Sequence, residues 1–379
     1  MMMRPTKPNK MKTALRERDM SCQRPSRARA EHEARFHPSL HCSLFSLVVF
    51  LLLCILAVVT SGCVTQDASV ADSGLVSLLN QARDEVSWEH EDALAQASET
   101  GRAFWSDYER YAIEEWRTRS SDDALARAVA SYESAYEELA RDETLSPAEY
   151  RRTATRHLLR SAHGYYLLGF MHAPVWRGEA GARKRRADAL LACRLGARRA
   201  KEALTLYHDE ALVQEMLERP TPRKLNEVQE KTALHALQWY ALNTQCEMEM
   251  ESGRRRVKLQ PVVAALLEEL SLRGLSSDYG MVHGAIGSYY AQHGQGGSNS
   301  KKSREHFAKG LDMWPNNLML HVLYAEHYAT AVQDAMLFDR ELETVLRVPS
   351  DLVDELREEN KIALARAKRL VEAREELFY

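Results

Sequence analysis

The sequence has few of the features that mark a β-sheet protein. No stretch alternates apolar and polar residues for long enough to form a half-buried strand, and no Asn-Gly pair marks a hairpin turn. Apolar residues instead recur at steps of three and four, as at Leu75, Leu78, Ala82 and Val86. This spacing places side chains on one face of a helix. The sequence therefore predicts an all-α protein.

The chain also lacks the motifs of common enzymatic chemistry. It contains no His-Glu-x-x-His zinc motif and no Gly-x-Ser-x-Gly nucleophile elbow. The segment from His293 to Lys302 is rich in glycine, but it lacks the Gly-Lys-Ser/Thr ending of a phosphate loop. The histidines between His157 and His327 are scattered, and packing is their expected role, because a metal needs three or four converging ligands. We expect no enzymatic activity, no cofactor and no metal.

Charge is distributed unevenly along the chain. Residues 1–42 carry a net charge of +6, residues 43–62 carry none, and the remainder carries −9. Binding to a phosphate backbone needs a basic face. The acidic remainder therefore excludes nucleic acid as a partner.

The uncharged segment at residues 43–62 is a continuous apolar run that ends in small residues directly before Cys63. This ending resembles the lipobox of bacterial lipoproteins, in which the cysteine takes a diacylglycerol and becomes the new N-terminus. Thr60 departs from the usual leucine of that box. We interpret residues 1–62 as a leader with a lipoprotein-type signal and residues 63–74 as a polar tether.

An uncleaved transmembrane anchor is the alternative, because twenty apolar residues can span a bilayer. Both interpretations place the rest of the chain outside the cytoplasm, since the basic flank stays inside. The basic leader is long for a signal peptide. This length favours translation from Met11 or Met20 over a cytoplasmic tail.

Two cysteines follow Cys63 in the chain, at Cys193 and Cys246. An oxidising compartment permits a disulfide between them. The other interpretation is that both are small buried residues on separate helices. The predicted fold does not depend on this choice.

Most of the predicted helices come in pairs, and residues 75–145 form a diverged helical region before them. The paired helices lie in a tetratricopeptide-like domain at residues 146–379, and they are residues 148–172 with 184–207, 228–250 with 262–272, 279–292 with 303–315, and 324–328 with 334–349. Each pair leaves an apolar face that a neighbouring pair must cover, so we expect the pairs to stack into a superhelix. A charged final helix, residues 352–378, is expected to cap the array.

The third pair follows the tetratricopeptide pattern most closely. Its first helix holds Gly287, and its second keeps the spacing of small residue, aromatic, small residue and proline at Ser303, Phe307, Gly310 and Pro315. The small residues would let the two helices approach closely, and Phe307 would be buried between hairpins. The loop from His293 to Lys302 is longer than helix–helix connections usually are.

This part of the chain resembles the T-component (TatT-like) lipoproteins of TRAP transporters. The family shows a histidine, an aromatic residue, a Gly-Gly loop and an AREHF-type helix, and the matching residues here are His283, Tyr289, Gly296, Gly297 and Ser303–Phe307. A helix bearing Trp239 and the ending Ala373–Phe378 are also similar. The resemblance covers residues 156–378.

The resemblance implies a lipoprotein on the periplasmic face of the envelope, in the outer membrane rather than the inner one. It implies binding to the substrate-binding subunit of a tripartite ATP-independent periplasmic (TRAP) transporter. It further implies a homotrimer with a channel through each subunit for hydrophobic or organic-acid ligands. The expected binding residues are His283, Tyr289, Tyr290, Gly296, Gly297 and Trp239. The alternative function is a generic envelope scaffold that holds another protein.

Overall fold

The computed structural model describes residues 74–100, 105–225, 228, 231–274, 279–293 and 297–378. All regular secondary structure in these residues is helical, and it belongs to one compact unit, Thr65–Tyr379. The predicted all-α class is confirmed. No helix in the described ranges is both long enough and apolar enough to cross a membrane. The apolar run at residues 43–62 and Cys63 lie outside the described residues.

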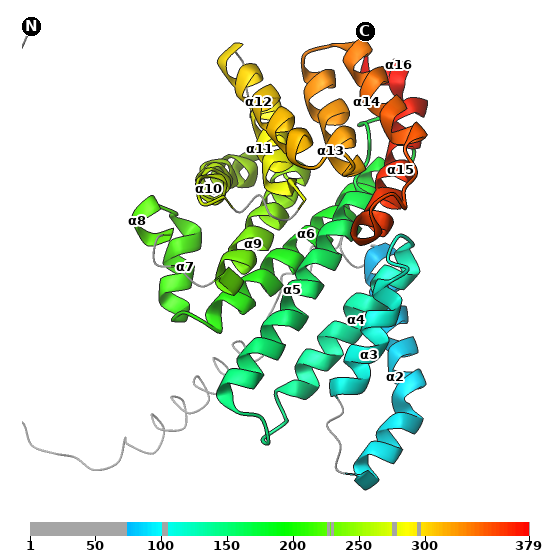
Figure 1. Cartoon of the computed structure of the whole chain (residues 1–379), viewed down its shortest axis with the longest axis vertical. Helices are drawn as coiled ribbons and strands as arrows, with labels where there is room; N and C mark the ends of the chain where they lie inside the picture. Colours follow the sequence, from blue (N-terminus) through cyan, green and yellow to red (C-terminus); the bar gives the residue numbers. More distant parts are fainter. Residues whose placement is uncertain are drawn as a thin grey trace, which may run out of the picture. The chain divides into compact units, whose positions relative to one another are not determined.

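Three helices form the region that the sequence marks as diverged, and Figure 1 draws them in blue and cyan. They are α2 (Gly74–Thr100), α3 (Trp105–Trp116) and α4 (Asp122–Leu139). Leu75 and Val86 of α2 are fully buried, as the spacing of apolar residues predicts. Helix α4 packs against both α3 and α5, so this region shares its core with the rest of the unit.

Helices α5 (Pro147–His172), α6 (Ala182–Thr205) and α9 (Lys231–Met250) form the centre of the unit (Figure 1). Helix α5 begins one residue before the predicted start at residue 148, and a capping box marks its beginning. The Ser146 hydroxyl accepts from the Glu149 backbone N–H, and the Glu149 carboxylate accepts from the Ser146 N–H. Helix α6 packs closely against both α5 and α9.

Small residues of α6 allow these close approaches. Apart from Asp188 and Leu204, the buried positions along the helix carry small side chains, at Ala189, Ala192, Cys193, Gly196, Ala197, Ala200 and Ala203. A Cβ at Gly196 would lie 2.1 Å from Oδ1 of Asn243 on α9. Any larger residue at Gly196 would therefore push α6 and α9 apart.

Cys193 of α6 and Cys246 of α9 form a disulfide, with their Cα atoms 5.7 Å apart. The structure thus decides between the two interpretations of these cysteines. A Cβ at Gly169 of α5 would lie 2.8 Å from Sγ of Cys193. The three central helices meet at this point, and two of them are covalently joined.

Two short helices, α7 (Glu210–Glu218) and α8 (Pro222–Leu225), precede α9, which then pairs with α10 (Gly253–Leu272). Helix α10 begins well before the predicted start at residue 262. Pro261 lies inside it, and proline normally ends or kinks a helix. This is why the sequence pattern favours a start after the proline.

The hairpin of α11 (Met281–His293) and α12 (Gly297–Met313) has the predicted repeat register. The Ser303 hydroxyl donates a 2.7 Å hydrogen bond to the Gly287 carbonyl oxygen. Phe307 is fully buried, and a Cβ at Gly287 would lie 2.6 Å from its ring. The absence of a side chain at Gly287 therefore makes the space for Phe307.

The predicted loop from His293 to Lys302 is wrong in length. Helix α12 already begins at Gly297, so only residues 294–296 connect the two helices, and these lie outside the described residues. Serine and asparagine are as typical of helix starts as of loops, which explains the error. Lys301 pairs with Glu305 one turn later, at 3.8 Å, as helical residues do.

The next pair consists of α13 (Leu318–Leu323), which continues as the π-helix η1 (Tyr324–Ala329), and α14 (Ala335–Arg347). The residues that the sequence assigns to its core are buried, including Tyr324, Ala325, Tyr328, Phe338, Leu342 and Val345. The predicted pairing of these helices is confirmed by their packing.

The C-terminal segment differs from the predicted capping helix. It forms a 3-10 turn, η2 (Asp354–Leu356), then α15 (Arg357–Glu372) and the short α16 (Arg374–Leu377). Glu359 and Arg366 of α15 are buried, although charged residues usually lie in solvent. Each has a partner of opposite charge inside the protein, and these ion pairs join α15 to earlier parts of the chain.

Candidate ligand cavity

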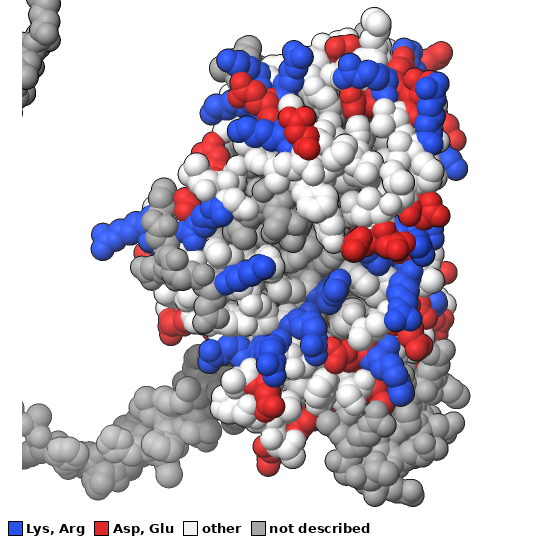
Figure 2. Space-filling model, in the orientation of Figure 1, with Lys and Arg blue, Asp and Glu red and all other residues white. Residues whose placement is uncertain are grey.

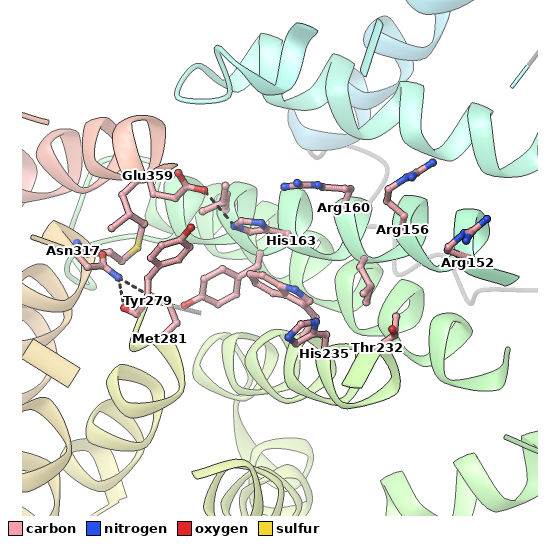
Figure 3. A pocket seen from close by; sticks show the side chains of 16 residues that line it. Arg152, Arg156, Arg160, His163, Thr232, His235, Tyr279, Met281, Asn317 and Glu359 are labelled. Atoms are coloured by element: carbon pink, nitrogen blue, oxygen red, sulfur yellow. Dashed lines mark hydrogen bonds and ion pairs between the residues drawn. The ribbon is translucent and has the colours of Figure 1, made fainter. Parts of the chain in front are cut away.

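A cavity of about 520 Å³ lies between α5, α9 and the first residues of α11, α13 and α15. Its walls therefore come from segments that are far apart in the sequence. Figure 3 shows the side chains that line it. Small-molecule sites in proteins typically have a volume of this order.

Three arginines stand in a row at one end of the cavity. Arg152, Arg156 and Arg160 are four residues apart on α5, so they share one face of the helix (Figure 3). Arg156 forms a 2.7 Å ion pair with Glu109, and the guanidinium of Arg160 lies 5.1 Å from the centre of the Trp116 ring. Glu149 also interacts electrostatically with Arg152, but three guanidinium groups outnumber these two carboxylates, so the row keeps a net positive charge.

The same charge is visible on the molecular surface. On the face drawn in Figure 2, Lys and Arg atoms gather across the lower middle, where α5 runs in Figure 1. A basic entrance raises the local concentration of anions. This end of the cavity therefore favours an anionic group.

Aromatic side chains line the middle of the cavity. The ring of His163 on α5 stacks on Trp239 of α9, with ring centres 4.2 Å apart, and Tyr166 lies tilted against Trp239 at 5.9 Å. Burial lowers the pKa of His163 well below its ordinary value, and the charges of Arg119 and Arg160 lower it further. The His163 ring is therefore neutral and presents a flat surface beside Trp239.

The opposite end is formed by Tyr279, Met281, Asn317 and Met319. The Asn317 side-chain amide donates a 2.7 Å hydrogen bond to the Tyr279 carbonyl oxygen (Figure 3). Tyr279 has a φ of 53°, which is uncommon for a residue with a large side chain. The Asn317 bond therefore helps to hold this end of the cavity in a strained backbone conformation.

These features together suit non-covalent binding. Arginine binds carboxylates through parallel hydrogen bonds, and the aromatic and methionine side chains favour an apolar body. Among the described residues, no group of three or more His, Cys, Asp or Glu side chains could hold a metal ion. The cavity can therefore bind an organic molecule with an acidic group at one end.

The structure places the predicted binding residues at different locations. Trp239 lines the cavity. His283 is buried within the α11–α12 hairpin, where its Nδ1 lies 3.1 Å from Nδ1 of His306. Gly296 lies outside the described residues, and Gly297 is the first residue of α12.

Tyr289 and Tyr290 are buried in a core formed mainly by α9, α10 and α11. The Tyr290 hydroxyl donates to Glu268, and Lys302 lies 4.7 Å from the centre of its ring. Neither tyrosine lines the cavity. A ligand or partner that contacts either of them would therefore have to bind at a different site on the protein.

The predicted repeat residues meet within one hairpin. Gly287 lies against both Ser303 and Phe307, and a Cβ at Gly310 would lie 3.4 Å from Cβ of His283. Pro315 follows the end of α12 and is exposed. Their arrangement supports the hairpin structure.

The sequence analysis missed the arginine row and His163. The signal was available, because the steps of four from Arg152 to Arg160 place these residues on one helix face. An arginine stripe on a single helix is usually a solvated surface, however. The arginine row becomes part of a cavity because α9 and the first residues of α11, α13 and α15 pack beside α5.

The comparisons with known proteins agree with the fold. The model of the TRAP transporter T-component family matches residues 143–378, whereas no curated protein matches the chain. The match begins just before α5 and includes every residue that lines the cavity. The chain belongs to the TRAP transporter T-component family.

Proposed function

We propose that the protein is a lipid-anchored accessory subunit of a TRAP transporter. In this proposal it is held at the periplasmic face of the envelope through Cys63 and binds the transporter's substrate-binding subunit. Its cavity holds a small organic or hydrophobic ligand. The supporting observation is the family match, which includes the entire lining of the cavity.

Binding to the substrate-binding subunit is tested by affinity capture. The tagged full chain is expressed in its native host, and its partners are identified in solubilised envelopes by mass spectrometry. The expected partner is the substrate-binding subunit of a TRAP transporter, and the purified pair should also associate in solution. Capture of a different envelope protein, with no TRAP subunit bound, would support the generic scaffold and contradict the proposal.

Ligand binding in the cavity is tested by native mass spectrometry of the purified full chain. We expect a bound small molecule that is lost in Trp239→Ala, because Trp239 forms the aromatic wall. Tyr240→Ala is the matched control, since the neighbouring aromatic residue on α9 does not line this cavity. Equal ligand content in both variants would contradict the assignment of the cavity.

A further inference from the structure

A second, smaller chamber lies next to the ligand cavity. It has a volume of about 170 Å³ and is bounded by α5, α9, α11 and the π-helix η1. We name it the inner chamber, and its lining includes Phe170, Gln245, Cys246, Ser288, Glu326 and Arg366. Among the described residues, Tyr166 is the one side chain that lines both the cavity and the inner chamber.

Tyr166 separates the two spaces by packing alone. Its ring lies tilted against Trp239, and the structure gives its hydroxyl no hydrogen-bond partner among the described residues. Burial raises the pKa of Tyr166, and the charge of Glu249 in the inner chamber raises it further, so the hydroxyl stays protonated.

The lining of the inner chamber can accept part of a ligand. The ion pair between Glu326 and Arg366 satisfies both charges, and the Glu249 carboxylate accepts a 3.0 Å hydrogen bond from the Gln245 amide, so these charged groups of the lining have partners within the protein. Oε1 of Gln245 is buried without a hydrogen-bond partner in the described structure. The wall formed by η1 is a π-helix, a rare conformation that occurs frequently at functional sites.

The inner chamber is also held in shape. Cys246 in its wall is joined to Cys193, and Gly169 lies directly against this disulfide. The Gln245 amide donates to the Ala285 carbonyl oxygen at 2.9 Å, which ties α9 to α11 across the chamber. Collapse of this space is therefore opposed by a covalent bond and by a buried hydrogen bond.

We infer that Tyr166 is a specificity-determining residue that limits the length of the ligand. The inference rests on the proposed function of the cavity. A ligand whose acidic group binds the arginine row extends along Trp239, where the Tyr166 ring closes its way into the inner chamber and confines it to the cavity that ends at Tyr279 and Met319. Removing this ring joins the inner chamber to the cavity and admits a longer molecule.

The test measures how binding affinity depends on chain length in a series of straight-chain carboxylates. The purified full chain is titrated calorimetrically with the series from butanoate to dodecanoate. In the wild type, the affinity should rise about fourfold with each buried methylene, as ~0.8 kcal/mol per methylene predicts, and then stop rising at a certain length. In Tyr166→Ala, the rise should continue for several further methylenes.

Three control variants test whether a changed length limit is caused by the loss of the Tyr166 ring. Tyr166→Phe retains the ring and should show the wild-type limit. Leu159→Ala enlarges the cavity away from the inner chamber and should also leave the limit unchanged. Ala285→Leu, added to Tyr166→Ala, should refill the inner chamber and restore the limit.

The outcomes separate the two proposals. An identical length limit in wild type and folded Tyr166→Ala would overturn the role of Tyr166 and leave the cavity as a ligand site. If no carboxylate binds even to the wild type, the inference about Tyr166 fails, whereas the proposed function is decided by the capture and native mass spectrometry experiments. Should Tyr166→Ala not fold, as judged by circular dichroism, Tyr166→Leu takes its place with a smaller expected extension, and an unchanged limit in it overturns the inference.

Discussion

Arg119 donates hydrogen bonds from Nε and Nη2 to the two carboxylate oxygens of Glu359, at 3.0 and 2.5 Å. The two residues are 240 positions apart in the sequence, and both are buried. Their bond joins the turn after α3 to the start of α15. Because Glu359 also lines the cavity, this ion pair fixes the position of a cavity wall.

We predict that Arg119→Leu lowers the free energy of unfolding by about 3 kcal/mol, because it leaves the Glu359 carboxylate buried without its partner. Urea denaturation measures the loss. The double variant Arg119→Leu with Glu359→Leu should lose less than the single variant does.

The control for this prediction is an exposed pair of similar geometry, Arg374 with Asp339. Arg374→Leu should cost much less than Arg119→Leu does, because exposed ion pairs contribute little to stability. Equal losses at the two sites would show that burial of Arg119 and Glu359 contributes nothing.

Phe307→Ala should lower the free energy of unfolding by about 3–5 kcal/mol, because the side chain is fully buried against Gly287 and Tyr324. Thermal and urea unfolding of the full chain measure this change. Met313→Ala, on the exposed end of the same helix, serves as the control. An unchanged midpoint for Phe307→Ala would contradict the repeat register.

The hairpins could be predicted from sequence because their signals are local. The spacing from Ser303 to Gly310 determines which helix faces meet, and the cap at Ser146 marks the start of α5. A π-helix such as η1 has no comparable local signature. Its residues Tyr324 and Tyr328 have the same buried spacing as those of an ordinary helix.

The cavity could not be predicted in the same way, because distant segments assemble it. Arg156 and Trp239 belong to helices with recognisable patterns, but nothing nearby in the sequence specifies that Met319 and Glu359 enclose them. That closure depends on long-range contacts such as the one between Arg119 and Glu359. Such pairings follow from the complete fold and not from any single helix.

Removing the disulfide should destabilise the protein strongly. The bond closes a loop with a sequence separation of 53, for which chain entropy predicts a contribution of about 4 kcal/mol. We expect this loss for the double variant Cys193→Ala with Cys246→Ala, measured by urea unfolding. If its stability instead equals that of the wild type under reducing and oxidising conditions alike, the bond does not form in solution.

Glu341 should make stability depend on acid pH. Burial alone would raise the pKa of Glu341, but hydrogen bonds from His321 and Arg340 lower it overall below 4.5. A lowered pKa contributes stability above the ordinary value of 4.5, and this contribution disappears as the pH falls through the folded-state pKa.

Glu341→Gln should therefore be less stable than the wild type near neutral pH, and the difference should shrink below pH 4.5. Urea unfolding across this range tests the prediction. Glu343→Gln, on the exposed side of the same helix, should show little difference at any pH. A constant gap between Glu341→Gln and the wild type would contradict the role of its charge.

Lipidation at Cys63 is predicted from the small residues before it and the polar tether after it. Cys63→Ser should accumulate as an unprocessed precursor, visible as a larger band after electrophoresis. The wild type should incorporate labelled fatty acid. Normal maturation of Cys63→Ser, with membrane attachment and without label, would rule out the lipoprotein interpretation.

The disulfide between α6 and α9 also makes the mature fold depend on the cellular compartment. Thiols are kept reduced in the cytosol, so the bond forms only where oxidants act. A chain still awaiting secretion would lack this bond, and its weaker central helices would unfold more easily for passage through a translocation pore. Oxidation after passage would then form the disulfide and disfavour unfolding of the folded chain. The mature protein would thus resist unfolding in a compartment where no ATP-driven chaperone can refold it.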